Sequence, residues 1–455
     1  MANRILLQGG HVVTMDPSIG DLSPGDVLIE GDTIAQVAPT IDVNDARVID
    51  VAGDVVIPGF IDSHRHTWEA AIRGSAPNAT LDDYFVEVLD SFAPLYQPDD
   101  VYASNLWGSL ECLNAGITTL VDWSHINNTP DHPDAAIQGL KETGIRAQYA
   151  YGSANTSLAD YWFESSIAMP AEDVERIRTT YIPTDDGLIT MALATRGPGF
   201  CKPEVVKTEW ELAKALGIPV TVHVAMGRLA GRFGMVKQLS DAGLLQARTT
   251  YIHSCYLSDE EWKLVKDSGG TISIAAQVEL QMGHGSPPTH QSLEHGLRPS
   301  LSIDVVTTVP GDMFTQMRAV FGAERVSVLS ACWVEDVDAP ADMITARQAL
   351  EMATVNGAHV VGVEDRSGSL TPGKKADVVV IDGSAPNVAP IMDPVAAVVI
   401  SADVSNVDTV IVNGEIKKQD GKLIGVDLDR GRDLIETSRD NLLGRLKEKR
   451  AQAQT

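Results

Sequence analysis

Cysteine is scarce in this chain, and the few that are present are far apart. The 455 residues include four cysteines, Cys112, Cys201, Cys255 and Cys332, with no CxxC pair among them. A zinc ribbon needs closely spaced cysteines and a small disulfide scaffold needs many cysteines, so the sequence favours neither. A reducing cytoplasm is therefore the expected location.

Positive charge is also in short supply. Lysine and arginine total 35 against 62 acidic residues, which gives a net charge of −27. A chain this acidic repels nucleic acid and anionic membranes, so we expect neither as a partner. The sequence also has no apolar run close to the roughly 20 residues of a membrane span. The N-terminal stretch MANRILLQGGHVVTMDP is broken by two glycines and is typical of a strand, not of a signal peptide.

The middle of the chain, by contrast, has abundant short apolar runs alternating with segments of helical periodicity. The chain is 44% apolar, enough for a large core. The expected strands are VVIPGFID, GITTLVDW, GIRAQYAYG, LITMALAT, IPVTVHVAM, TTYIHSC, GTISIAAQ and PSLSIDV. Eight buried strands alternating with helices predict a parallel (β/α)8 barrel of the TIM type, over residues 58–367.

The two ends of the chain differ from this pattern. Residues 1–57 and 368–430 hold short strand-like runs punctuated by glycine and aspartate, and neither end has enough strands for a stable unit alone. Together they predict one small β-sandwich built from both termini. Residues 431–455 predict an exposed amphipathic helix.

Two histidines one residue apart follow the first barrel run, in PGFIDSHRHTWEA. Alternate side chains of a strand point to the same face, so His64 and His66 project side by side if residues 55–66 form one strand, with Arg65 turned away. Two such imidazoles are half of a metal site. Taken alone, the pair is also compatible with one histidine packed in the core and one exposed at the surface. The residues at the other strand ends are needed to distinguish a metal site from this structural role.

Those ends carry a further set of polar side chains. The C-terminal ends of the strands form the active face of a (β/α)8 barrel. The polar residues expected there are His64, His66, Asp122, His125, Thr195, Arg196, His223, His253 and Asp304. Imidazoles and a carboxylate converging on one face predict a divalent metal site.

Four motifs make the chain resemble the amidohydrolase superfamily, in the branch with cytosine, guanine and S-adenosylhomocysteine deaminases and triazine hydrolases. They are PGFIDSHRH, ECLNAGITTLVDW, HGLRPSLSID and ATVNGAHVVGVEDRSGSLTPGKKADVVVID. The resemblance implies one divalent ion, Zn²⁺ first and Fe²⁺ or Mn²⁺ as alternatives, on His64, His66, His223 and Asp304. It also implies a homo-oligomer acting on a small molecule.

The resemblance assigns proton transfer to Asp304 and His253. Such an ion lowers the pKa of its water towards about 7, and a carboxylate beside that water takes its proton. Binuclear members place a carboxylated lysine at the end of strand four, where LATRGPGF has Arg196, so one metal is expected instead of two.

The pattern departs from the deaminases at strand five. They usually read HxxE there, whereas HVAMG places Met226 at the glutamate position, and a thioether cannot carry a proton. Glu279 in AAQVELQMG or Glu69 after HRHTW is a candidate replacement. Alternatively, the scissile bond needs less acid assistance.

Several other side chains near the strand ends are candidates for substrate contact. Arg196 and His125 face the pocket in this interpretation, while Trp68 (or Trp123) can stack on a flat ring and Glu69 can approach it. The histidines of QMGHGSPPTHQSLEHG, at 284, 290 and 295, lie in a loop that spans the barrel mouth. They are expected to be mobile surface residues, with substrate contact by one of them as the alternative.

The sequence thus predicts a metal-dependent hydrolase in which metal-bound hydroxide attacks a C–N bond of a small, heterocyclic nitrogen compound, most simply a deaminase. Because of Met226, hydrolysis of an amide or carbamate, or hydrolytic dehalogenation, is the alternative. A non-catalytic binding protein on the same fold is the third possibility, although such proteins generally lose metal histidines.

Overall fold

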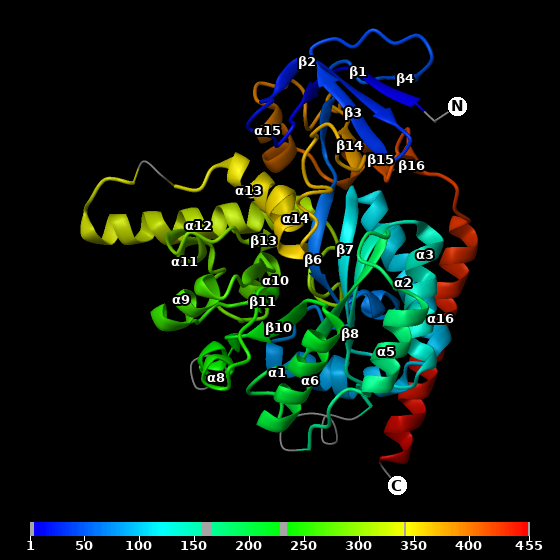
Figure 1. The fold of residues 1–455 in the computed structure, drawn as a ribbon, viewed down its shortest axis with the longest axis vertical. Helices are drawn as coiled ribbons and strands as arrows, with labels where there is room; N and C mark the ends of the chain where they lie inside the picture. The colour runs from blue at the N-terminus through cyan, green and yellow to red at the C-terminus, as the bar shows by residue number, and fades with distance from the viewer. Residues whose placement is uncertain (1–3, 157–164, 228–233, 341–342, 454–455) are drawn as a thin grey trace.

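A computed structural model describes the chain except for residues 1–3, 157–164, 228–233, 341–342 and 454–455. A barrel forms the body, and a smaller sheet built from both ends of the chain lies above it (Figure 1). The barrel and the small sandwich predicted from the sequence are both confirmed.

Eight parallel strands in sequential order make the barrel. They are β6 (Phe60–Arg65), β7 (Ile117–Ser124), β8 (Arg146–Gly152), β9 (Ile189–Thr195), β10 (Val220–Val224), β11 (Thr249–His253), β12 (Thr271–Ile274) and β13 (Ser300–Leu301). Nearly every residue in them is buried, as expected of strands that a ring of helices covers on the outside.

Helices connect and cover these strands (Figure 1). The longer ones are α2 (Pro98–Asn114), α3 (Asp131–Thr143), α5 (Ala171–Thr180), α6 (Pro203–Leu216), α8 (Met235–Asp241), α9 (Asp259–Asp267), α12 (Met313–Glu335), α13 (Ala346–Ala353) and α14 (Val355–Val361). Shorter helical segments are η1 (Thr67–Ile72), α1 (Leu81–Tyr84), η2 (Phe85–Asp90), η3 (Ala93–Leu95), α10 (Ala276–Gln281) and α11 (Thr289–Glu294). Within the described residues, no helix is both long enough and apolar enough to cross a membrane.

The small sheet joins strands from opposite ends of the chain. It contains β1 (Arg4–Val12), β2 (Leu22–Glu30), β3 (Thr33–Ala38), β4 (Arg47–Asp50), β5 (Val55–Pro58), β14 (Val378–Ile381), β15 (Val407–Val412), β16 (Glu415–Gln419) and β17 (Lys422–Leu423). The two halves meet where β5 pairs antiparallel with β14. Short helical turns, α15 (Pro394–Ala396), η5 (Ala397–Ser401) and η6 (Val404–Asn406), connect β14 to β15.

The apolar run expected as one strand over residues 55–66 is divided at Gly59. Val55–Pro58 belongs to the small sheet, whereas Phe60–Arg65 is the first barrel strand. A Cβ added to Gly59 would lie 2.0 Å from the Oγ1 atom of Thr118 on β7. The chain therefore passes from one sheet to the other at a point where only glycine fits.

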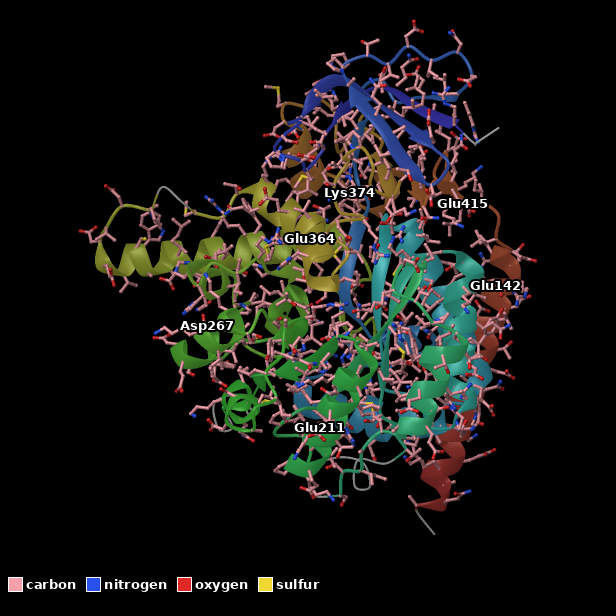
Figure 2. The ribbon with its side chains drawn as sticks, in the orientation of Figure 1. Glu142, Glu211, Asp267, Glu364, Lys374 and Glu415 are labelled. Atoms are coloured by element: carbon pink, nitrogen blue, oxygen red, sulfur yellow. The ribbon has the colours of Figure 1, made fainter. Side chains whose placement is uncertain are left out.

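The C-terminal helix is α16 (Leu428–Gln452), and the expectation of an exposed amphipathic helix is wrong for one of its faces. Leu442 and Leu446 are buried on that face, which packs along α2. The Oγ atom of Ser438 donates a hydrogen bond of 2.8 Å to Asp100 of α2. The rest of the helix is exposed, and acidic side chains such as Glu211, Asp267 and Glu415 are exposed elsewhere over the molecule (Figure 2).

The division at Gly59 generates a stability prediction. Gly59→Ala should lower the free energy of unfolding by about 1–3 kcal/mol, because the new methyl group overlaps Thr118 and the strands must shift. Urea denaturation measures the change. Gly444→Ala is the matched control: its Cβ meets nothing within 4 Å, and alanine favours the α16 helix. Equal stability of the two variants would contradict the account of the junction.

Candidate metal centre and active site

A cavity opens at the carboxyl ends of the barrel strands, the face predicted to carry the chemistry. It has an empty volume of about 510 Å³. Its polar lining consists of His66, Trp123, His125, Arg196, His223, His253, His284 and Asp304. Its apolar lining consists of Leu81, Tyr84, Phe85, Leu89, Phe200, Met226, Met282 and Val305.

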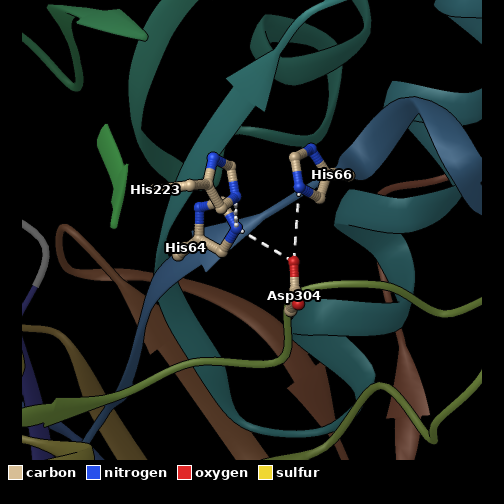
Figure 3. Close-up of side chains that lie close together, drawn as sticks. All are labelled: His64, His66, His223 and Asp304. Atoms are coloured by element: carbon tan, nitrogen blue, oxygen red, sulfur yellow. Dashed lines mark hydrogen bonds and ion pairs between the residues drawn. The ribbon is translucent and has the colours of Figure 1, made fainter. Parts of the chain in front are cut away.

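Three histidines and one aspartate converge at the floor of this cavity (Figure 3). The ligand atoms of His64, His66, His223 and Asp304 all lie within 4.8 Å of one another. The Oδ1 atom of Asp304 is 3.0 Å from Nε2 of His64 and 3.3 Å from Nε2 of His66. The Nε2 atoms of His223 and His64 are 3.1 Å apart. These atoms point at one common centre, as ligands around a cation do.

The electrostatics of the cluster also suit a cation. Burial lowers the pKa of His64 to about 3 and the pKa of His223 well below its ordinary value, so both imidazoles are neutral and can offer a lone pair. The Nδ1–H of His66 donates to the carbonyl oxygen of Trp123 at 3.1 Å, and its Nε2 atom faces Asp304. Burial disfavours the charged form of His66, but the hydrogen bond with Asp304 and the nearby carboxyl group of Glu69 raise its pKa. Burial alone would raise the pKa of Asp304, but the interactions of its carboxylate with His64 and His66 outweigh burial and keep that pKa well below normal.

The set therefore fits a divalent ion of the Zn²⁺ class. Three imidazoles and one carboxylate are the ligands such ions favour, and the cavity above them leaves room for water or substrate. Asp304 and His253 also have left-handed backbone, both with φ of 67°. Non-glycine residues rarely adopt this conformation, and it concentrates at functional sites.

His253 lies beside the cluster with its orientation fixed from behind. Its Nδ1 atom is 3.2 Å from Oε1 of Glu279, and its Nε2 atom is 3.7 Å from Oδ2 of Asp304. Oε1 of Glu279 also accepts the backbone N–H of Ala275 at 2.9 Å, so it acts as an acceptor towards His253 as well. His253 is thereby held with its proton on Nδ1 and its Nε2 lone pair towards Asp304.

The carboxyl group of Glu279 lies deeper than the sequence indicated. Glu279 is on α10, fully buried, and does not line the cavity. Burial raises its pKa well above the ordinary value. Its influence on a substrate therefore passes through His253.

Two of the four predicted substrate contacts do line the cavity. Arg196 and His125 both lie in its wall, at the ends of β9 and β7. The Nη2 atom of Arg196 donates to Oε1 of Glu209 at 3.1 Å, and both side chains are buried. Burial lowers the pKa of His125 well below its ordinary value, so His125 is a neutral hydrogen-bonding group.

The other two, Trp68 and Glu69, lie behind the wall. Trp68 is 0% exposed and packs edge-on against Tyr96 and His125, with ring centres 5.0 and 5.4 Å away. Both residues are on η1, which turns their side chains away from the cavity. The indole in the cavity wall is instead Trp123, whose ring centre lies 4.4 Å from that of His223. The prediction that Trp68 and Glu69 contact the substrate directly is therefore not supported.

Glu69 lies beneath the cavity wall. It accepts a hydrogen bond from the hydroxyl of Tyr84, which does line the cavity, and another from Thr307 at 3.1 Å. Burial raises the pKa of Glu69 to about 7, although the charge of His66 opposes the rise. Met226 does line the cavity, so a thioether faces it from the end of strand five. Among the described residues of the lining, Asp304 is the one carboxylate.

One histidine for which a surface position was favoured lies in the site. His284, expected on a mobile surface loop, is 2% exposed and lines the cavity beside His253, with ring centres 4.6 Å apart. His290 and His295 lie outside the cavity lining, and the side chain of His290 is 57% exposed. Gly283 and Gly285 flank His284 with φ of 72° and 143°. A histidine between two glycines was the signal available in the sequence.

The Amidohydrolase family model matches residues 55–417, which is most of the chain, and the chain therefore belongs to this family. Its curated relatives include the 5'-deoxyadenosine deaminase of Methanosarcina mazei, 27% identical over 97% of this chain and 99% of the relative. Another is the 5-methylthioadenosine/S-adenosylhomocysteine deaminase of Pyrococcus abyssi, 27% identical over 94% of this chain and 96% of the relative.

Solved structures with the same fold include enzymes with bound zinc. An adenosine deaminase from Xanthomonas campestris superposes with a TM-score of 0.83 at 22% identity, covering 97% of this chain and 98% of that one. Atrazine chlorohydrolase of Arthrobacter aurescens TC1 gives 0.83 at 24% identity, covering 96% and 100%. Together with the family match, these findings confirm the expected fold and family and the class of enzyme, a hydrolase with deaminases among its relatives.

The convergence of the four ligand atoms generates a metal-binding prediction. His64→Ala should lower zinc affinity by more than about a hundredfold, because even a group that only hydrogen-bonds to a ligand is worth about 10- to 100-fold. Metal retained after dialysis, measured by mass spectrometry, tests this. His359→Ala, which changes a histidine outside the cavity, should retain metal like the unaltered protein. Equal retention by both variants would contradict the ligand assignment.

Proposed function

We propose that the protein is a metal-dependent hydrolase that removes an amino group from a small heterocyclic compound. The observation that carries the proposal is the convergence of His64, His66, His223 and Asp304 beneath a cavity with a largely apolar wall. The family and its deaminase relatives support the same reaction class.

These four residues would hold one divalent ion, with Zn²⁺ the best fit and Fe²⁺ or Mn²⁺ as alternatives. When bound, such an ion supplies hydroxide near neutral pH by lowering the pKa of water towards about 7. Asp304 offers its second oxygen, Oδ2, towards Nε2 of His253. A proton taken up by Asp304 can therefore reach His253 and then the leaving group.

The cavity walls would orient the substrate. Trp123 offers a flat surface beside His223, and the hydrophobic side chains of Phe85 and Phe200 line the same cavity. Arg196, held by Glu209, and the neutral imidazole of His125 supply hydrogen bonds to polar atoms of a ring.

A second reaction has specific support. Met226 lines the cavity at the position where related deaminases have a glutamate, so acid assistance to the leaving group is weaker than in those enzymes. Hydrolysis of an amide or carbamate, or hydrolytic dehalogenation, needs less of this assistance and is the alternative reaction.

We also propose a cytoplasmic homo-oligomer, on grounds independent of the site. All four cysteines are free thiols, which is usual in a reducing compartment. The end of α12 extends away from the barrel (Figure 1), and Val326, Trp333 and Val334 on it are 61%, 64% and 87% exposed. A second subunit would cover these apolar side chains, and sedimentation velocity on the full chain tests this.

The proposed reaction predicts ammonia release from an amino-substituted ring. Zinc-loaded protein should release ammonia from at least one member of a panel of aminopyrimidines, purines, pterins and triazines, and Asp304→Ala should abolish that turnover. Amides, carbamates and halogenated rings are assayed in parallel. Turnover of these compounds without ammonia from any ring would replace the leading reaction by the alternative one.

A second prediction concerns Glu279 as the residue that positions His253. Glu279→Ala removes the acceptor for Nδ1–H and should lower kcat by about a hundredfold with little change in KM, because His253 loses its orientation. Glu279→Gln keeps an acceptor oxygen and mimics the protonated acid that burial favours, so it should restore most of the activity.

The pair of variants separates two roles of Glu279. A hundredfold loss in Glu279→Gln as well would mean that the carboxyl group itself carries a proton. Full activity in Glu279→Ala would mean that it does not act in the reaction.

A further inference from the structure

We propose that His253, His284 and Asp304 form a second divalent-cation site, weaker than the first, whose filling inhibits the enzyme. The inhibitory part rests on the proposed function, whereas the existence of the site does not. The two sites would share Asp304, each using one of its carboxylate oxygens.

The geometry of Asp304 supports two neighbouring ions. Oδ1 faces His64 and His66, at 3.0 and 3.3 Å, while Oδ2 faces Nε2 of His253 at 3.7 Å. The ligand atoms of His253, His284 and Asp304 all lie within 4.8 Å of one another. A carboxylate bridging two ions is a common arrangement in two-metal hydrolases, whose ions lie about 3.5–4 Å apart.

His253 is already held as a metal ligand would be. Its Nδ1–H donates to the buried carboxyl of Glu279, which leaves the Nε2 lone pair directed at Asp304. Metal-binding histidines almost always make such a hydrogen bond through the second ring nitrogen. The first site shows the same pattern, where Nδ1–H of His66 donates to the carbonyl of Trp123.

His284 supplies the observation that points independently to a ligand. Its side chain is buried and lines the cavity, yet neither ring nitrogen has a hydrogen-bond partner within the described part of the chain. Leaving a buried polar group unpaired costs about 1–3 kcal/mol, so such a group usually has a hydrogen-bond partner, a water molecule or a bound ion beside it. An ion between His253 and His284 would meet this requirement.

The second site does not depend on the bridging lysine of binuclear relatives, whose position is taken by Arg196. It has three protein ligands where the first site has four, and it shares its only carboxylate. Its affinity is therefore lower, and it fills only when zinc exceeds one equivalent.

Filling the second site would remove a group that the proposed reaction needs. Nε2 of His253 can bind an ion or a proton, but not both. Turnover should therefore rise with the first equivalent of zinc and fall with the second. The fall should approach a hundredfold, because general acid–base catalysis contributes about 10²- to 10⁴-fold.

Zinc stoichiometry is the direct test. Metal-free protein is titrated with zinc in equilibrium dialysis, and the bound metal is counted by mass spectrometry. The unaltered protein should bind two ions per chain with separate affinities, and His284→Ala and His284→Gln should each bind one. His290→Ala is the matched control: it changes an exposed histidine of the same loop that lies outside the cavity lining, so this variant should still bind two ions.

Three results would overturn the proposal: one ion in the unaltered protein, two ions in a folded His284 variant, or equal loss of the second ion in His290→Ala. Circular dichroism and the urea midpoint establish that the variants are folded. One ion in the unaltered protein together with a raised KM in His284→Ala would assign His284 to substrate binding instead.

The inhibitory role is tested by a separate measurement of turnover against zinc concentration. Each protein is compared with its own maximum at one equivalent of zinc, and excess zinc should inhibit the unaltered enzyme but not His284→Ala. Inhibition of both to the same degree would contradict the inhibitory role. If no substrate is turned over, the proposed function fails, yet the stoichiometry still decides whether the second site exists.

Discussion

The closure of the barrel between its first and last strands is the contact on which the site depends. The last strand, β13, has only two residues, and regular pairing does not continue from it to β6. Backbone hydrogen bonds of Asp304 complete the junction, one from its N–H to the carbonyl of His64 at 3.0 Å and one from the N–H of His66 to its carbonyl at 2.9 Å. The backbone of Asp304 thus closes the barrel, while its carboxylate joins the histidines of the first strand. Any opening of this junction would separate the candidate ligands.

Around this junction, buried carboxyl groups lie next to the histidines on the side away from the cavity. Glu279 meets His253 from outside the cavity, and Glu69 lies close enough to His66 for their charges to interact. Burial raises the pKa of Glu69 to about 7 and that of Asp122, which accepts a hydrogen bond from Asn105, to about 6. Burying a carboxylate is costly unless it is paired or protonated. A cation at the cavity floor would supply a neighbouring positive charge, which favours the ionised form of these carboxyl groups.

The sequence predicted those features that follow from local periodicity. Alternation along a strand placed His64 and His66 on one face, and the rule that barrel chemistry lies at strand ends found His223, His253 and Asp304. It failed where a side chain's direction depends on the turn after a strand. η1 turns Trp68 and Glu69 behind the wall, whereas a glycine-flanked turn brings His284 into the cavity. The division at Gly59 was missed because both halves of the run are equally apolar, so only the clash with Thr118 separates them.

The small sheet cannot be completed until the C-terminal strands have been synthesised. β5 ends at Pro58 and its partner β14 begins at Val378, so the whole barrel is translated between them. At roughly 5–20 residues per second, β5 leaves the ribosome on the order of tens of seconds before β14 exists. For that time its apolar edge, Val55–Ile57, has no partner on the β14 side, and an unpaired edge can pair with the wrong strand. The N-terminal sheet, far from the residues proposed to do the chemistry, is therefore exposed to aggregation in the nascent chain.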